Sequence, residues 1–315
     1  MINGKAQQVG EQLKTAGRLA VGTWALGGGR DWGSDTPVEQ AEATLQAAVA
    51  QGVRLFDTAP VYGNGRAEEI VGRSLRAYRH SVKIATKCGI VLREGRPDHD
   101  LSPACIYAQC EQSLRRLGTD YIDLYQIHWP DPKIPLAESL GALVRLKEQG
   151  KIRAIGVCNM SVAQLQEAVR ITQIDCVQGP LSLLDNSGRE TADWCAQTHI
   201  PFMAYGCLGG GILSGKYTKE PNLRRCDARR YFYKYYVGQS FARAVQVAKR
   251  VKQIAQAKKV SAGAVALAWV LAVPGVSACL TGVRSPAQLA DNIGALRVVL
   301  SAQEQQFLYD ISPGN

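Results

Sequence analysis

The sequence lacks the features that mark several common classes of protein. It has no CxxC pair, and its nine cysteines and four histidines form no cluster with metal-ligand spacing, so no bound metal is expected. The first residues, MINGKAQQVGEQLK, contain no apolar segment of the kind that signal peptides carry. Cysteines that are odd in number and mostly inside apolar segments are typical of reduced thiols, and we therefore expect a cytoplasmic protein.

Long apolar runs are also absent. Ala262 to Leu280 lie within the longest stretch without a charged residue, and Pro274 and Gly275 interrupt it. This pattern predicts a buried helix followed by a strand, and no membrane span. With 46% hydrophobic and 20% charged residues, the composition is that of an ordinary globular protein.

The charge is unbalanced but scattered along the chain. A formal net charge of +10 is compatible with an anionic partner. The densest basic segment, Leu223 to Tyr236, mixes arginines with aromatic residues that could stack on nucleic-acid bases. Nothing else in the chain indicates a nucleic-acid-binding fold, so we expect no nucleic-acid partner and a loop that contacts an anionic ligand.

Short apolar runs alternate with longer helical segments along the whole chain. Such alternation is typical of parallel βα units, and strands covered on both faces are nearly continuously apolar. The eight strand candidates are residues 18–26, 53–59, 82–87, 121–129, 152–159, 174–179, 200–206 and 276–282. Eight units predict an α/β fold, a (β/α)8 TIM barrel, in a single domain spanning residues 1–315.

The main alternative is a doubly wound open sheet, which carries GxGxxG between its first strand and the next helix. Here Gly27, Gly28 and Gly29 are followed by no helical pattern, and this favours the barrel. The first fifteen or so residues precede the first strand and are expected to form an N-terminal plug.

Capping sequences mark the starts of several helices. Thr36, followed by Pro37 and Glu39, predicts a threonine cap with a capping box. Similar capping sequences begin at Ser102, Ser161, Ser285 and Ser301. The last of these predicts an added C-terminal helix that ends near Ile311.

Four polar residues lie at or after the ends of three consecutive strand candidates. They are Asp57, Tyr62, Lys87 and His128. Taken singly, each has an ordinary explanation, such as a helix cap, core packing or a lysine that reaches solvent. In a parallel barrel, however, the carboxyl ends of the strands meet at one mouth, where active sites of this fold are built. We therefore expect the four side chains to form one site.

This set of residues suits proton donation to a carbonyl group. A free tyrosine has a pKa of about 10, which is high for acid–base work near neutrality. A neighbouring ammonium group lowers that pKa, and a carboxylate holds the ammonium in place. Lys87 and Asp57 are expected to do this for Tyr62, while a neutral His128 hydrogen-bonds the substrate oxygen.

The same residues resemble the signature sequences of the aldo-keto reductases. FDTAPVYG, IATK, YIDLYQIHWPD, GKIRAIGVCN and GVRSPAQLADN are similar to successive family blocks and extend from about Trp24 to Asn292. GTWALGG together with QIHWPDP most resembles the bacterial general-stress branch. The resemblance implies NADPH-dependent reduction of an aldehyde or ketone, with Tyr62 as general acid, tuned by Lys87, which Asp57 positions.

The resemblance also implies where the cofactor binds. Asn159 and Gln178 match positions that hold the nicotinamide amide, and Tyr205 matches the ring stacked beneath it. Arg284 precedes a helix start, where backbone N–H groups favour a phosphate, and a guanidinium suits the 2′-phosphate of NADPH. The remaining cofactor-binding candidates are Thr23, Trp24, Gly206, Leu208, Gly282, Gln288 and Asn292.

Two departures from the family pattern concern the cofactor site. Cys158 replaces a serine that often helps hold the carboxamide, and Gly210 stands where related sequences often carry arginine, which predicts a more mobile loop there. Cys158 and Cys207 also fall near the mouth, where positive potential would raise the thiolate fraction and reactivity; inert buried thiols are the alternative.

The resemblance implies a small-molecule carbonyl substrate. Trp24 and Trp129 are candidates for the wall of its pocket. Two other functions stay open: a Schiff-base aldolase that uses Lys87, and a cofactor-binding regulatory subunit with little turnover. We expect a monomer or weak homo-oligomer.

Overall fold

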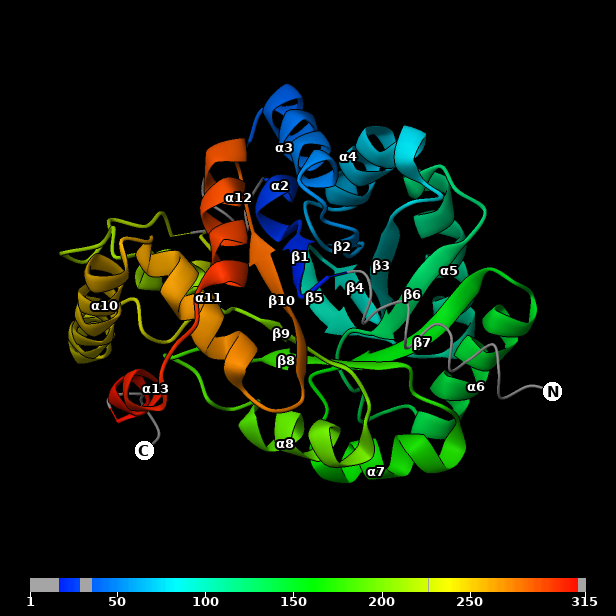
Figure 1. The fold of residues 1–315 in the computed structure, drawn as a ribbon. Helices are drawn as coiled ribbons and strands as arrows, with labels where there is room; N and C mark the ends of the chain where they lie inside the picture. Colours follow the sequence, from blue (N-terminus) through cyan, green and yellow to red (C-terminus); the bar gives the residue numbers. More distant parts are fainter. Residues whose placement is uncertain (1–16, 29–35, 226, 311–315) are drawn as a thin grey trace.

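The computed structural model describes residues 17–28, 36–225 and 227–310. Eight parallel strands close into a barrel in the order β1-β10-β9-β8-β7-β6-β3-β2, and helices surround it (Figure 1). The strands are β1 (Leu19–Gly22), β2 (Leu55–Asp57), β3 (Lys83–Cys88), β6 (Ile122–Ile127), β7 (Ile152–Cys158), β8 (Cys176–Pro180), β9 (Phe202–Tyr205) and β10 (Val276–Gly282). The predicted barrel is confirmed. The predicted N-terminal plug lies outside the described residues.

The helices that surround the barrel follow the predicted alternation. They are α3 (Val38–Ala50), α4 (Arg66–Leu75), α5 (Pro103–Leu117), α6 (Leu136–Glu148), α7 (Val162–Ile171), α8 (Arg189–Thr198), α10 (Gly238–Lys258), α11 (Ala262–Ala272) and α12 (Pro286–Ile293). The added C-terminal helix, α13 (Ala302–Tyr309), packs beside α10. Shorter helical segments are α2 (Trp24–Gly27), η1 (Arg76–Tyr78), η2 (Gly209–Ser214), α9 (Arg229–Phe232) and η3 (Gly294–Arg297).

Most of the predicted helix caps are present. The side chains of Ser102, Ser161, Ser285 and Ser301 each accept a hydrogen bond from the backbone N–H three residues later. Thr36 does not cap α3, because that helix begins one residue later than expected and Pro37 is its N-cap. The Thr36 hydroxyl donates instead to the carbonyl of Ala25, 3.4 Å away.

The first strand is shorter than predicted. β1 ends at Gly22, and Trp24–Gly27 forms the short helix α2. The reason is local: the backbone N–H and the hydroxyl of Thr23 both donate to the carbonyl of Asp57, which ends the strand. The N–H groups of Leu26 and Gly27 then turn back to the Thr23 carbonyl.

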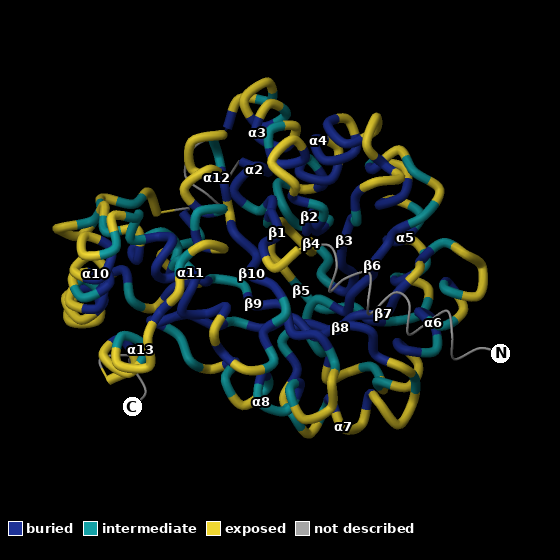
Figure 2. Tube along the Cα trace, in the orientation of Figure 1, coloured by how far each residue is buried: buried dark blue, intermediate teal, exposed yellow. Residues whose placement is uncertain are grey.

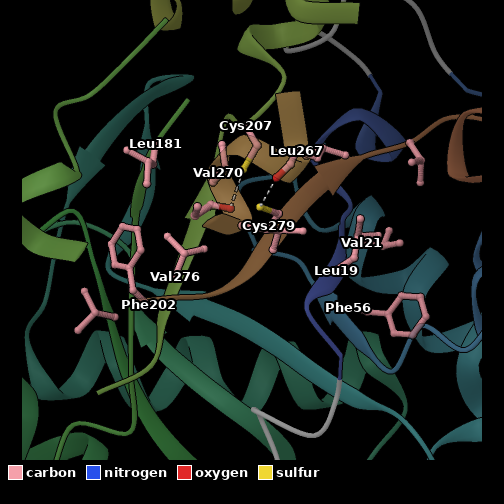
Figure 3. Close-up of a cluster of buried hydrophobic side chains, with 14 of the residues drawn as sticks. Leu19, Val21, Phe56, Leu181, Phe202, Cys207, Leu267, Val270, Val276 and Cys279 are labelled. Carbon is pink, nitrogen blue, oxygen red and sulfur yellow. Dashed lines mark hydrogen bonds between the residues drawn. The ribbon is translucent and has the colours of Figure 1, made fainter. Parts of the chain in front are cut away.

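The core has two layers. The larger one lies between the barrel and its helices, whose outer faces are exposed while the strands are buried (Figure 2). Figure 3 shows a part of it, where Leu267 and Val270 of α11 lie near Cys279 of β10. The smaller layer fills the barrel interior. It consists of Ala20, Leu55, Ala85, Leu124, Ala154, Cys176, Met203, Ala278 and Leu280.

Among the described helices, none alone is long and apolar enough to cross a bilayer. Only α10 and α11 taken together reach such a length and composition, and they are bent by 101°.

Candidate active site

The barrel interior determines which residues face the mouth. Along a strand, side chains two residues apart lie on the same face. Asp57, Lys87 and Gln126 each lie two residues after a member of the interior layer, and so do Gln178 and Tyr205. Polar side chains from five strands therefore point inward, one layer above the apolar interior.

Asp57 and Lys87 form a buried ion pair at the centre of this polar layer. Lys87 Nζ lies 2.6 Å from Asp57 Oδ1 and also donates to the Thr58 carbonyl at 2.9 Å. Lys87 is 0% exposed and Asp57 is 3% exposed. Burial is the largest single effect on the pKa of Lys87 and lowers it, but Asp57, Tyr62 and Cys158 together outweigh it, so the net pKa is raised and the lysine stays protonated.

The second carboxylate oxygen of Asp57 is held by two glutamine side chains. Asp57 Oδ2 accepts from the side-chain amides of Gln126 at 3.2 Å and Gln178 at 3.0 Å. Gly156 leaves the space that Gln126 occupies, since a Cβ there would meet Gln126 Cγ at 2.7 Å. Both oxygens are thus engaged, which fixes the carboxylate and, through it, Lys87.

Tyr62 meets this pair from the loop after β2. Its hydroxyl lies 3.4 Å from Lys87 Nζ, and its ring stacks on Trp24 at 6.0 Å between centroids. The expected net lowering of its pKa is wrong. Burial raises the pKa of Tyr62 to about 12, and the opposing effect of Lys87 is smaller. Tyr62 is therefore a protonated phenol at neutral pH.

His128 follows β6 and lies across from Tyr62, with 5.9 Å between ring centroids. Burial lowers the pKa of His128 well below its usual value, and the charge of Lys87 lowers it further. The imidazole is neutral at physiological pH, as the sequence predicts. Its backbone carbonyl accepts from the side-chain amide of Asn159 at 2.9 Å, which connects β6 to β7.

Asn159, Gln178 and Tyr205 lie together on the next three strands. The Tyr205 hydroxyl donates to Asn159 Oδ1 at 2.8 Å. Asn159 adopts a left-handed backbone conformation, with φ of 59°, which asparagine tolerates better than most residues. The Gln178 amide group donates to Asp57, so the residues expected at the nicotinamide share a hydrogen-bond network with the expected proton donor.

One cavity of about 760 Å³ is lined both by these residues and by Arg284. Every predicted cofactor-binding and pocket residue lines it, as do Asp57, Tyr62 and His128. Lys87 does not line it, because it lies behind Tyr62. The structure thus brings the predicted residues together, although their roles stay predictions.

The far end of the cavity is formed by the start of α12. Ser285 caps this helix, and the backbone N–H of Arg284 donates to Gln288 Oε1 at 2.9 Å. The Arg284 carbonyl accepts from the Gln40 side chain at 2.7 Å. The backbone on either side of Arg284 is therefore held, while its side chain is partly exposed and lines the cavity.

The structure explains why position 210 is a glycine. Its φ is 60°, and a Cβ would meet Tyr236 Oη at 2.8 Å and Tyr233 Cδ2 at 2.9 Å. The Tyr236 hydroxyl donates to the Gly210 carbonyl at 2.6 Å. The loop that was expected to be mobile is thus the 3-10 segment η2, which Tyr236 of the basic segment holds. Arg229 and Lys216 line the cavity nearby.

The two thiols near the mouth are buried. Cys158 is 0% exposed and Cys207 is 1% exposed. Burial raises the pKa of Cys158, despite the opposing charge of Lys87. Its thiol faces Gln126 Oε1 at 3.5 Å and does not line the cavity. The expectation of a raised thiolate fraction at Cys158 is therefore wrong, because burial outweighs the positive charge.

Several residues of the site were not predicted. The antiparallel hairpin of β4 (Ile90–Arg93) and β5 (Arg96–His99) adds His99 to the cavity wall. Its signal in the sequence is the turn at Glu94-Gly95, both with positive φ. Phe232 packs edge-on against Trp24 at 5.1 Å. Gln126, a second polar residue in β6 besides Asp123, was not singled out either.

Comparisons with known proteins agree with this geometry. A family model described as "Aldo/keto reductase family" matches residues 18–311. An aldo-keto reductase of Bacillus subtilis is 36% identical over 281 residues, covering 87% of this chain and 83% of that protein. An NADH-specific methylglyoxal reductase of Escherichia coli is 31% identical over 313 residues, covering 95% of each.

Solved structures also match this chain over most of its length. The glycerol dehydrogenase of Gluconobacter oxydans matches with a TM-score of 0.85 and 34% identity, over 95% of this chain and 93% of that chain. An aldo-keto reductase of Klebsiella pneumoniae in complex with NADPH matches with a TM-score of 0.73 and 28% identity, over 95% and 92%.

Proposed function

The chain belongs to the aldo-keto reductase family, and we propose that it reduces an aldehyde or ketone reversibly with NADPH, using Tyr62 as the general acid. The observation that carries this proposal is the position of Lys87 Nζ, which lies 2.6 Å from Asp57 Oδ1 and 3.4 Å from the Tyr62 hydroxyl. A buried ammonium between a carboxylate and a phenol stabilises the phenolate that proton donation leaves behind.

The residues fit a nicotinamide dinucleotide. Gln178 and Asn159 offer amide groups at the inner end of the cavity, Tyr205 offers a ring, and Arg284 offers a guanidinium at the outer end. Bound there, the cofactor supplies the hydride. A guanidinium beside a capped helix N-terminus favours a 2′-phosphate and hence NADPH. The Escherichia coli relative is named NADH-specific, so this preference requires its own measurement.

The protein's own residues handle the proton. Tyr62 donates its hydroxyl proton to the carbonyl oxygen as that oxygen gains negative charge, and solvent returns a proton afterwards. Lys87 keeps its charge throughout, since Asp57 raises its pKa. Neutral His128 donates a hydrogen bond to the same oxygen and orients it. Trp24 and Trp129 wall the space beside these groups and exclude water.

A substrate panel tests the proposal. Simple aldehydes and ketones should oxidise NADPH, seen as loss of its absorbance, and a single turnover should oxidise enzyme-bound NADPH. Bound NADPH that no aldehyde oxidises would instead indicate the regulatory subunit. Borohydride trapping of a substrate on Lys87 would indicate the aldolase, against which its pairing with Asp57 argues. The cytoplasmic location, the monomeric or weakly oligomeric state and the lack of a nucleic-acid partner stay predictions.

A further inference from the structure

A second pocket opens beside the active-site cavity. Its volume is about 300 Å³, and it shares Trp129, Tyr205 and Phe232 with the larger cavity. Trp129 directly follows His128 in the chain, so one wall of the second pocket adjoins the expected position of the reacting carbonyl. A substrate with its carbonyl at Tyr62 and His128 can extend over Trp129 into this pocket.

The wall of the second pocket is mainly aromatic. Its aromatic residues are Trp129, Tyr205, Tyr231, Phe232, Tyr233 and Tyr235. The rings pack on one another, with centroid distances of 5.1 Å for Phe232–Tyr233 and 5.5 Å for Tyr233–Tyr235. The Tyr235 hydroxyl is buried and has no hydrogen-bond partner among the described residues.

The pocket also contains one carboxylate, that of Asp185. Its Oδ1 accepts from the backbone N–H of Ser187 at 3.0 Å and from the Ser187 hydroxyl at 2.5 Å. Within the described chain Asp185 forms no ion pair, and Arg189, the nearest arginine in the sequence, is engaged by Asp193 at 3.0 Å. The pocket thus holds a negative charge that the described part of the protein does not neutralise.

The field of Asp185 reaches the aromatic wall. Burial raises the pKa of Tyr205, Tyr233 and Tyr235, and the charge of Asp185 adds to the rise in all three. Aromatic faces carry negative potential, so rings that line the same pocket as a carboxylate can add to its attraction for a cation.

We propose that this pocket binds an ammonium group carried by the carbonyl substrate, with Asp185 as the counter-ion and the aromatic rings as the cage. The proposal rests on the proposed function and names a class for its substrate: an aldehyde or ketone with a cationic nitrogen at the end distant from the carbonyl. Such a substrate also keeps its positive charge away from Lys87, which lies behind Tyr62.

Binding is tested first, without turnover. Choline and its neutral isostere, in which a tert-butyl group replaces the trimethylammonium group, are titrated into the full-length protein, with quenching of tryptophan fluorescence as the readout. Choline should bind about tenfold more tightly, or better, because cation–π contacts and one carboxylate favour only the charged ligand. Equal affinity for the two ligands overturns the proposal.

Two matched variants locate the effect. Asp185→Asn keeps an oxygen that can accept the Ser187 N–H, so it removes the charge while retaining the loop contact. It should abolish the preference for choline. Asp193→Asn removes a carboxylate that does not line the pocket, and it should retain the preference. Retention of the preference in Asp185→Asn overturns the role of this residue, provided that its thermal midpoint matches wild type.

Substrate use is then compared with an isosteric pair. 4-Trimethylammoniobutanal, in which three methylene groups separate the cationic nitrogen from the carbonyl carbon, should show a kcat/KM about tenfold above that of its tert-butyl analogue, and Asp185→Asn should bring the two values together. Equal kcat/KM values in wild type overturn the inference but leave the proposed function standing. If no aldehyde or ketone of any charge oxidises NADPH, the proposed function fails, while the choline titration still reports on the pocket.

Discussion

The two ends of the candidate active-site cavity differ in construction. Asp57 and Tyr62 line its inner end with Lys87 behind Tyr62, and Arg284 lines its outer end. At the inner end, Asp57 and Lys87 belong to barrel strands and have several side-chain and backbone partners within 3.2 Å. At the outer end, Arg284 lies between a strand and a helix, with its backbone held and its side chain partly exposed.

This difference separates two kinds of effect. A change at the inner end disturbs buried charges, so it should affect both the chemical step and stability. A change at the outer end removes a contact that water can partly replace, so it should affect cofactor affinity alone.

The largest effect is expected for Tyr62→Phe. The variant keeps the ring that stacks on Trp24 but removes the proton, so kcat should fall by about 10²–10⁴-fold. The affinity for NADPH, measured by cofactor fluorescence, should stay near that of wild type. Turnover close to the wild-type rate would contradict the role of Tyr62.

Asp57→Asn should destabilise the protein strongly. Both Asp57 oxygens accept hydrogen bonds, from Lys87 on one side and from Gln126 and Gln178 on the other. In the variant, the NH₂ group of the new asparagine must face one of these donors, either Lys87 or the two glutamines. Lys87 also loses its counter-ion. Breaking a buried pair in this way costs about 3–5 kcal/mol of unfolding free energy, measurable by chemical denaturation.

The matched control for this change is Asp193→Asn. Its ion pair with Arg189 is partly exposed, and removing it should cost under about 1 kcal/mol. Similar losses for the two variants would show that the inner end is no more tightly built than the surface.

Arg284→Ala should weaken NADPH binding by about 1.5–3 kcal/mol, the range for hydrogen bonds to charged groups. NADH binding and the unfolding free energy should change little, since NADH lacks the 2′-phosphate. Arg297→Ala, an exposed arginine that does not line the cavity, is the control. Equal losses for NADPH and NADH would show that Arg284 does not recognise that phosphate.

The smallest effect is expected from pH. The pKa of Tyr62 is raised to about 12, and the pKa of His128 is lowered well below its usual value. Tyr62 therefore loses its proton only far above neutrality, and His128 gains one only well below it. kcat/KM for reduction at saturating NADPH should stay level between about pH 7 and about pH 9. A steep decline across this interval would indicate that a different group titrates.

The sequence predicts which residues meet at the inner end of the cavity better than it predicts their pKa values. Strand periodicity and the shared mouth of a parallel barrel were enough to bring Asp57, Lys87 and His128 together. The pKa of Tyr62 was predicted in the wrong direction, because the degree of burial depends on the packing of distant segments. The reactivity expected of Cys158 failed for the same reason.

Local structure was also harder to predict where it depends on contacts with residues distant in the sequence. Thr23 ends β1 by bonding to Asp57, which is distant in sequence, so Trp24 was expected in a strand and lies in α2. The basic segment was expected to contact an anionic ligand. Its packing of Tyr236 against Gly210 could not be predicted, because both residues lie in loops without periodicity.

The hairpin of β4 and β5 forms part of the cavity wall but is attached to the barrel at a narrow base. Gly89 and Ile90 are clamped there by the Gln109 side chain, through two hydrogen bonds of 2.7 Å, and Asp100 closes the base by donating to the Gly89 carbonyl. A change confined to the tip of the hairpin should therefore alter the cavity wall while the strand order and the Asp57–Lys87 pair stay as they are.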